Sequence, residues 1–243
     1  MVVTYRGQTA LILGGSCGIG LDLAGLLLAQ GLRVVPTYAS DRGRLAIADR
    51  FPDLTSALHL DLADSSSDDS LAPVLSAGVD YLVDLAQADE EVLLAAASSL
   101  RAEAYFQAHI SHRLRLITAV TRTMLARRFG RLLHVSSTAA ALPAAGQGLY
   151  AAAKKAAESL YLSMGLELGT RGVTSLNLRL GLVDAGRGGR FLDSRGRDQD
   201  FAARIVSPDQ VASTLCFLLS DQALALTCTT ITMDAGLTAM KYQ

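Results

Sequence analysis

Short apolar runs alternate with longer segments of helical periodicity along this chain, and this alternation constrains its fold more than any other feature. The apolar runs predict strands, and the segments between them predict helices. Such alternation is typical of βαβ units, in which helices cover both faces of a parallel sheet. We therefore expect an α/β fold with a doubly wound, Rossmann-type parallel sheet of about seven strands.

The pattern predicts the following elements. Strands are expected at Thr9–Leu13, Leu32–Tyr38, Thr55–Leu60, Asp80–Leu85, Arg131–Val135, Val173–Leu178 and Thr229–Met233. Helices are expected at Ile19–Gln30, Arg42–Arg50, Glu103–Arg128, Gly146–Leu168 and Pro208–Leu219. The polar run Asp64–Ser70 fits a helix start better than a linker. A chain of 243 residues fits one large domain of this type, so a single domain over residues 1–243 is expected.

Composition excludes several classes of protein. The net charge of −1 argues against a nucleic-acid binder, which usually carries a basic excess. The cysteines Cys17, Cys216 and Cys228 show no CxxC spacing, so neither a disulfide framework nor a metal site is expected. The N-terminal residues lack the charged n-region and the cleavage site of a signal peptide, and apolar stretches such as Leu23–Ala29 are far shorter than the ~20 residues that span a bilayer. A cytoplasmic protein without membrane association is expected.

A glycine-rich turn, with the sequence GGSCGIG from Gly14 to Gly20, lies between the first predicted strand and its helix. Glycines permit tight turning and let the backbone approach a diphosphate closely. The following helix presents unpaired N–H groups and the positive end of its dipole. In this setting the turn predicts a nucleotide site, and the alternative is an ordinary tight connection.

The end of the second predicted strand bears on the choice of nucleotide. Sites for NAD usually place an acid there, but this chain has Tyr38, followed by Ser40 and Arg42. Arg42 could pair with a 2′-phosphate, which favours NADP(H) over NAD(H). Asp41 argues the other way, and Arg42 could equally be a solvated arginine at a helix start.

Tyr150 and Lys154 are four residues apart, so both side chains lie on one face of a predicted helix. A lysine ammonium beside a phenol favours the phenolate, which makes tyrosine a usable general acid or base. Ser137, at the end of the fifth predicted strand, could hydrogen-bond a substrate carbonyl and stabilise its developing charge. Tyrosine and lysine at this spacing also occur as surface pairs, and their position after the fifth strand makes the motif more specific.

Together these residues resemble the short-chain dehydrogenase/reductase family, most closely its 3-oxoacyl-(acyl-carrier-protein) reductases. The resemblance covers Thr9 to Leu237. It is carried by ALILGGSCGIG at Ala10–Gly20, HLDLAD at His59–Asp64, GRLLHVSS at Gly130–Ser137, YAAAK at Tyr150–Lys154 and a final ITMDAG that ends at Gly236.

The resemblance implies roles for individual residues. Tyr150 would donate the proton to the carbonyl oxygen during reduction, Ser137 would orient that oxygen, and Lys154 would hold the nicotinamide ribose. Further cofactor contacts are implied for Gly14, Ser16, Gly18, Ile19, Gly20, Tyr38, Ser40, Arg42, Asp61, Leu62, Ala86, Gly181 and Val183.

The chain departs from the family pattern mainly on the cofactor side. The family's threonine before the first glycine is Leu13, and the glycine that gives the cofactor room is Gln87. The proline after the sixth strand is Leu180, and a threonine that usually touches the nicotinamide amide is Ala185. The asparagine of the family's catalytic tetrad aligns with His109, which could relay protons in its place or simply be a packed histidine.

The resemblance also implies partners. The carrier-protein reductases dock their acidic partner with two arginines, whose positions match Arg128 and Arg171 here. The alternative is that both are solvated arginines at helix ends. Family members associate through their long helices, commonly as tetramers, and a heteromer with a homologous reductase is a second possibility. The glycine- and charge-rich segment at 184–206 is expected to be a substrate lid or else disordered.

Three functions fit these observations. The first is NADPH-dependent reduction of a 3-oxoacyl thioester on an acyl carrier protein. The second is reduction of a small free ketone, or oxidation of an alcohol. The third is a cofactor-poor structural subunit of a heteromeric ketoreductase.

Overall fold

A computed structural model describes residues 3–195 and 204–240. Seven parallel strands form one sheet with the order β3-β2-β1-β4-β5-β6-β7. The strands are β1 (Thr9–Leu13), β2 (Arg33–Tyr38), β3 (Leu58–His59), β4 (Tyr81–Asp84), β5 (Gly130–Ser137), β6 (Val173–Leu180) and β7 (Thr230–Met233). The expected doubly wound Rossmann-type sheet is therefore confirmed.

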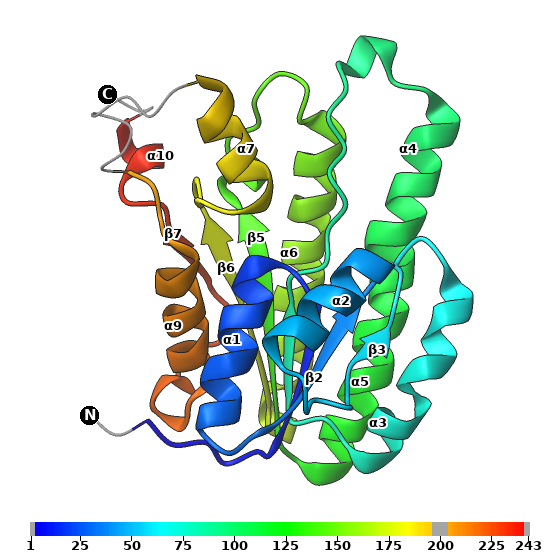
Figure 1. The fold of residues 1–243 in the computed structure, drawn as a ribbon, viewed down its shortest axis with the longest axis vertical. Helices are drawn as coiled ribbons and strands as arrows, with labels where there is room; N and C mark the ends of the chain where they lie inside the picture. The colour runs from blue at the N-terminus through cyan, green and yellow to red at the C-terminus, as the bar shows by residue number, and fades with distance from the viewer. Residues whose placement is uncertain (1–2, 196–203, 241–243) are drawn as a thin grey trace.

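Helices cover both faces of this sheet (Figure 1). Their bounds are α1 (Gly18–Ala29), α2 (Asp41–Arg50), α3 (Ala72–Ala77), α4 (Ser99–Phe106), α5 (Arg113–Arg127), α6 (Gly148–Leu168), α7 (Gly186–Arg195), α9 (Pro208–Leu219) and α10 (Leu237–Met240). One buried cluster packs α1 and α9 against one face of the sheet, and a second packs α3, α5 and α6 against the other.

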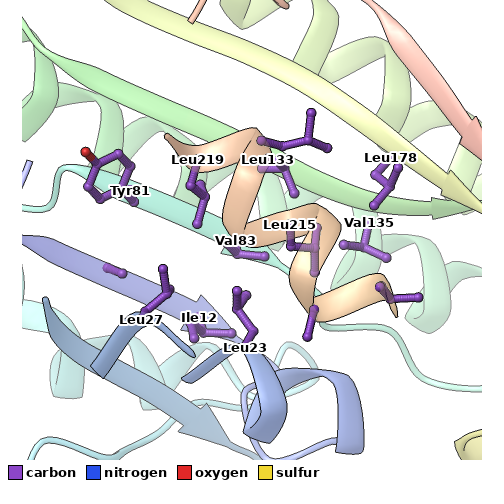
Figure 2. Close-up of a cluster of buried hydrophobic side chains, with 14 of the residues drawn as sticks. Ile12, Leu23, Leu27, Tyr81, Val83, Leu133, Val135, Leu178, Leu215 and Leu219 are labelled. Atoms are coloured by element: carbon purple, nitrogen blue, oxygen red, sulfur yellow. The ribbon is translucent and has the colours of Figure 1, made fainter. Parts of the chain in front are cut away.

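The first of these clusters shows how alternation along the strands builds the core. Figure 2 shows side chains of α1 and α9, among them Leu23 and Leu215, meeting strand residues such as Ile12 and Val83. All four are fully shielded from solvent. Because successive strand residues face opposite sides of a sheet, Leu11, the neighbour of Ile12, belongs to the second cluster. Burial on both faces fixes the register of the strands and hence the position of their ends.

The order of the strands shows at which edge of the sheet a binding crevice can open. The chain runs outward from β1 to β2 and β3 on one side, and from β4 to β7 on the other. At such a reversal the connections leave the sheet in opposite directions, and a crevice opens at the carboxyl ends of the strands. The glycine-rich turn follows β1 at this edge, and α7 lies beyond the carboxyl ends of β5 and β6 (Figure 1).

The long helix expected at Glu103–Arg128 is present as a continuous helical run to Arg127, but it begins earlier, at Ser99, and a π-helical turn interrupts it. The structure has α4, then a π-helical turn at Gln107–His112, then α5. A π-helical turn takes in one extra residue, so it rotates the residues on either side of it relative to one another. Here Arg113 is fully buried and donates to the carbonyl of His109 at 2.8 Å. The buried arginine thus gives that carbonyl a partner within the widened turn.

Two other expectations need adjustment. The third strand is only Leu58–His59 and forms the edge of the sheet beside β2, whereas the apolar run predicted Thr55–Leu60. The described part of segment 184–206 is not irregular, since it contains the helix α7. Residues 196–203 of the predicted lid lie outside the described residues. Asp64 caps a 3₁₀ helix, Ser65–Leu71, as the polar run predicted.

Among the described residues, no helix is both long enough and apolar enough to cross a membrane. The same residues contain no cluster of histidine, cysteine, aspartate or glutamate suited to a metal ion.

Candidate active site

A cavity of about 450 Å³ opens at the carboxyl ends of the strands. It extends from the glycine-rich turn, at Cys17 and Ile19, to the end of β5 and the start of α6. Of the residues predicted from the sequence, those lining it are Ile19, Ser137, Tyr150, Lys154, Gly181 and Val183. The sheet therefore brings both halves of the predicted site, from distant parts of the sequence, to one hollow.

Ser137, Tyr150 and Lys154 reach the cavity from two elements. Ser137 is the last residue of β5, and its Oγ accepts a hydrogen bond from the N–H of Ala139 at 3.2 Å. Tyr150 and Lys154 lie one turn apart on α6, and both are buried. The ammonium of Lys154 donates to the carbonyl of Val135 at 2.7 Å, which anchors α6 to the neighbouring strand.

Lys154 is a buried cation, with 3% of its surface exposed. Burial, with the positive charge of Arg113 as the next cause, lowers the pKa of Lys154 to about 7. Asp84 and Glu158 act in the opposite direction, and Arg187 lowers it further. Near neutral pH both the charged and the neutral form of this lysine are therefore populated.

The glycine-rich turn has the close backbone packing that a dinucleotide site requires. Gly14 has a φ of +71°, and a Cβ there would meet the backbone of Ala86 at 3.0 Å. A Cβ on Gly20 would meet the backbone of Gly15 at 2.7 Å, whereas Gly18 faces open space, with Ala185 the nearest side chain at 3.9 Å. Two glycines thus close the turn, and the third leaves room beside the helix N-terminus, so the turn fits a bound diphosphate.

The second strand brings its predicted residues next to this turn. Ser40 caps α2 by accepting from the N–H of Gly43, and Gly43 packs closely against Ser16. The ring of Tyr38 lies 5.7 Å from that of His59. Arg42 is exposed on the first turn of α2. Asp41 is ion-paired with Arg44 at 3.3 Å, a partner that the sequence did not suggest.

Asp61 and Leu62 lie after β3 and do not line the main cavity. Asp61 accepts from the N–H of Ala63, and the carbonyl of Leu62 is 2.7 Å from Nδ1 of His112. Leu62 and His112 line a second cavity of about 250 Å³. The adenine contacts implied for Asp61 and Leu62 stay predictions.

Two positions that depart from the family pattern, Gln87 and His109, are joined by one side chain, Arg113. Its guanidinium pairs with Asp84 at 2.8 Å and donates to Gln87 Oε1 at 3.3 Å and to the carbonyl of Ala86. Gln87 in turn donates to the Tyr105 hydroxyl at 2.5 Å. The amide that replaces the glycine is therefore held at both ends. Sequence reasoning missed Arg113, because a charged residue in a helix is normally assigned to the surface.

His109 is packed rather than solvated. Its Nε2 accepts from the N–H of Ala88 at 3.4 Å, and its ring lies 4.4 Å from that of Tyr105. Burial, followed by the charges of Arg113 and Lys154, lowers the pKa of His109 to about 3. The histidine is neutral at physiological pH, and Nδ1 carries the proton because Nε2 is an acceptor. Within the described chain Nδ1 has no hydrogen-bond partner.

Leu13 and Leu180, two further departures, are buried at the ends of β1 and β6. Leu180 also lines the cavity, as does Ala185. These apolar residues fill space with hydrocarbon where the family has hydrogen-bonding or ring groups, and the cavity persists around them.

Arg128 and Arg171 are exposed and lie in neighbouring loops, because the backbone of Arg128 packs against Gly172. These loops precede β5 and β6, whereas Ser137 ends β5. At ~3.3 Å per residue, the two ends of a strand of eight residues lie roughly 25 Å apart. The arginine pair and the cavity are therefore at opposite edges of the sheet.

Several lining residues were not predicted. Arg187 and Phe191 come from α7, Asp89 and Glu91 from the loop after β4, and Leu237 from α10. Their sequence context gave no motif, since each reaches the cavity only through the tertiary fold. The arginine-rich composition of segment 184–206 was the one available signal.

Comparison with known proteins agrees with this geometry. A family model for the short chain dehydrogenases matches residues 8–193. The chain is 29% identical to the 3-oxoacyl-(acyl-carrier-protein) reductase FabG of Escherichia coli, over 97% of this chain and 99% of the relative. It is 30% identical to FabG of Vibrio cholerae, with the same shares covered.

A solved structure of a short chain dehydrogenase/reductase family protein superposes with a TM-score of 0.84 at 29% identity. The match covers 98% of this chain and all of the other. The family model spans more than half of the chain and includes the turn, the serine and the tyrosine–lysine pair. The chain therefore belongs to the short-chain dehydrogenase family of oxidoreductases.

Proposed function

We propose that this protein reduces the ketone of a 3-oxoacyl thioester, carried on an acyl carrier protein, with NADPH as reductant. The observation that carries the proposal is the convergence of Ser137, Tyr150 and Lys154 on one cavity that also reaches the glycine-rich turn. The resemblance to FabG proteins, named as reductases of carrier-bound 3-oxoacyl groups, supports this choice of substrate.

Ser137, Tyr150 and Lys154 each have a separate role in the proposed reduction. Ser137, fixed at the end of β5, donates a hydrogen bond to the substrate carbonyl oxygen and orients it. Tyr150 donates the proton that the oxygen needs as the carbonyl becomes an alcohol. Lys154 binds the cofactor ribose and, when charged, stabilises the phenolate left on Tyr150. His109, neutral and close enough to Lys154 for its charge to act, lies beside this proton path.

A bound NADPH would supply the hydride. Gly14, Gly18, Ile19 and Gly20 would hold its diphosphate at the N-terminus of α1, with Ser16 beside them. Arg42 would meet the 2′-phosphate, which is supported by the pairing of Asp41 with Arg44 rather than with Arg42. Tyr38, Ser40, Asp61, Leu62 and Ala86 would border the adenosine, and Gly181 and Val183 the nicotinamide.

Arg128 and Arg171 would dock the acidic carrier. Since they lie at the edge of the sheet opposite to the cavity, a carrier bound there would serve the cavity of another copy. The docking hypothesis therefore requires an oligomer, and we propose a tetramer or a heteromer with a homologous reductase.

The purified chain, mixed with NADPH and an acetoacetyl thioester, should consume NADPH, as followed by absorbance at 340 nm. Titration with NADPH and NADH separates the alternatives. Turnover of free ketones that is insensitive to changes at Arg128 and Arg171 would favour a small-ketone reductase. Absence of nucleotide binding, together with co-purification with an active homologue, would favour a structural subunit.

A further inference from the structure

A second cation stands in the catalytic cavity besides Lys154. Arg187, on the first turn of α7, lines the cavity together with Ser137 and Tyr150. Its guanidinium carbon lies 3.9 Å from the centre of the Tyr150 ring, within the range of a cation–π contact. The planar cation therefore covers the face of the proposed proton donor, next to the place where the substrate carbonyl binds.

One nitrogen of the Arg187 guanidinium donates no hydrogen bond to any described residue. Nη1 of Arg187 is buried without a hydrogen-bond partner in the described structure, and it makes only a long ion pair, 3.6 Å, with Oε1 of Glu91. Three residues on, Arg190 is paired with Asp89 at 2.6 Å. Arg190 thus holds α7 to the loop after β4 by a short ion pair, whereas the pair of Arg187 with the same loop is too long for a hydrogen bond and leaves Nη1 at the cavity without an acceptor among the described residues. A buried donor without a partner is costly unless a ligand satisfies it.

The charges around this donor favour an oxygen acceptor. Lys154 and Arg113 are cations in the same region, and the charge of Arg187 is one cause of the lowered pKa of Lys154. Glu91 opposes these charges only from a half-exposed position. A carbonyl or carboxylate oxygen between Arg187 and Lys154 would reduce their mutual repulsion as well as accept the unused bond.

We propose that Arg187 determines specificity by donating to the second carbonyl oxygen of a 1,3-dicarbonyl substrate, which is the thioester oxygen of a 3-oxoacyl group. This inference rests on the proposed function. The ketone oxygen lies between Ser137 and Tyr150, and the thioester oxygen, two carbons away, reaches the guanidinium that covers the tyrosine ring. An isolated ketone has no such oxygen, whereas a free 3-oxo acid offers a carboxylate at the same distance.

The test compares acetoacetyl-N-acetylcysteamine, acetoacetate and 2-pentanone as substrates of the wild-type protein, Arg187→Met and the control Arg190→Met. Loss of a hydrogen bond from a charged donor should lower kcat/KM for the thioester by about tenfold or more relative to 2-pentanone in Arg187→Met. Arg190→Met should leave this ratio unchanged. An equal loss on all three substrates, or the same ratio change in Arg190→Met, would overturn the proposal.

A binding measurement separates this inference from the proposed function. Calorimetric titration of the same three compounds in the presence of NADP⁺, which cannot reduce them, should show weaker thioester binding in Arg187→Met and unchanged 2-pentanone binding. This result supports the assignment even if the wild-type protein turns over none of them, an outcome that contradicts only the proposed function. If only acetoacetate binding is lost, or wild-type protein binds none of the three, the thioester assignment is wrong.

Discussion

Burial of Lys154 opposes the positive charge that its proposed role requires. Its pKa of about 7 in the folded chain compares with 10.5 for a solvated lysine, chiefly because burial disfavours the ammonium. Below pH 7 the folded and unfolded chains are both protonated, so the whole cost of burying the charge is present. Between pH 7 and about 10.5 the folded chain releases the proton first, so stability increases with pH.

Replacement of Lys154 by methionine should remove this dependence. Relative to Lys154→Met, the wild-type free energy of unfolding should increase with pH between about 7 and 10, by up to ~1.4 kcal/mol per pH unit. Urea denaturation at several pH values measures it. Lys155→Met, which changes a mostly exposed neighbour, is the control and should keep the wild-type slope. Parallel curves for wild type and Lys154→Met would contradict the lowered pKa.

Some residues of the candidate site could be predicted from the sequence, and others could not. Tyr150 and Lys154 share a helix face at a spacing visible in the sequence, and Ser137 ends an apolar run, so their convergence could be predicted. Arg187 and Arg113 could not, because arginine in a helix normally indicates the surface. Only the fold shows that Arg113 is fully buried against Asp84 and that Arg187 covers the ring of Tyr150.

At the level of elements, the Arg113–Asp84 pair joins the end of β4 to the start of α5. Both side chains are fully buried, and Asp84 also accepts from the Tyr161 hydroxyl at 2.9 Å. Removing one member of such a pair leaves an uncompensated charge in the core, which typically costs about 3–5 kcal/mol of folding stability. The pair therefore fixes the loop after β4, which borders the proposed cofactor site.

Arg113→Met should accordingly destabilise the protein by about 3–5 kcal/mol in urea denaturation. The double variant Asp84→Asn/Arg113→Met, which buries no charge, should recover a substantial part of that loss. The pairing account is wrong if the single variant loses less than about 1 kcal/mol, or if the double variant is less stable than the single one.

Most elements followed from periodicity, and the exceptions have physical causes. The long helix predicted at Glu103–Arg128 has a suitable apolar pattern, but the π-helical turn at Gln107–His112 depends on the tertiary contact of Arg113. The edge strand β3 is shorter than the predicted run Thr55–Leu60 because only Leu58 and His59 of that run pair with β2. α7 lies in a glycine-rich segment that lacks the usual helix signals.

At the level of the whole molecule, the sheet separates the proposed docking arginines from the cavity by the length of β5. Charge reversal at Arg128 and Arg171 should raise KM for carrier-bound substrate and leave activity on a small thioester unchanged. If docking and chemistry use different copies, mixing this variant with Tyr150→Phe and allowing subunits to exchange should restore activity on the carrier-bound substrate. Failure to restore it in mixed oligomers, confirmed by sedimentation, would place docking and chemistry on one chain.

The alternation of strands and helices was sufficient to predict the doubly wound sheet, since parallel strands are normally buried on both faces and the rule of right-handed crossovers leaves few topologies. What it could not supply was the orientation of loops relative to the cavity. The arginine pair was assigned to docking by resemblance, and only the sheet shows that it faces away from the catalytic edge.

We propose above that Tyr150, in the cavity formed by β5, α6 and the glycine-rich turn, supplies the proton for reduction of a 3-oxoacyl thioester. The most direct measurement is absorbance at 340 nm after NADPH and an acetoacetyl thioester are added to wild-type protein and to Tyr150→Phe, with NADPH binding titrated in both. We expect NADPH consumption by wild type, none by Tyr150→Phe, and similar NADPH affinity for the two proteins. Turnover by Tyr150→Phe within about threefold of wild type, a difference far below the usual effect of a general acid, would contradict the proposal.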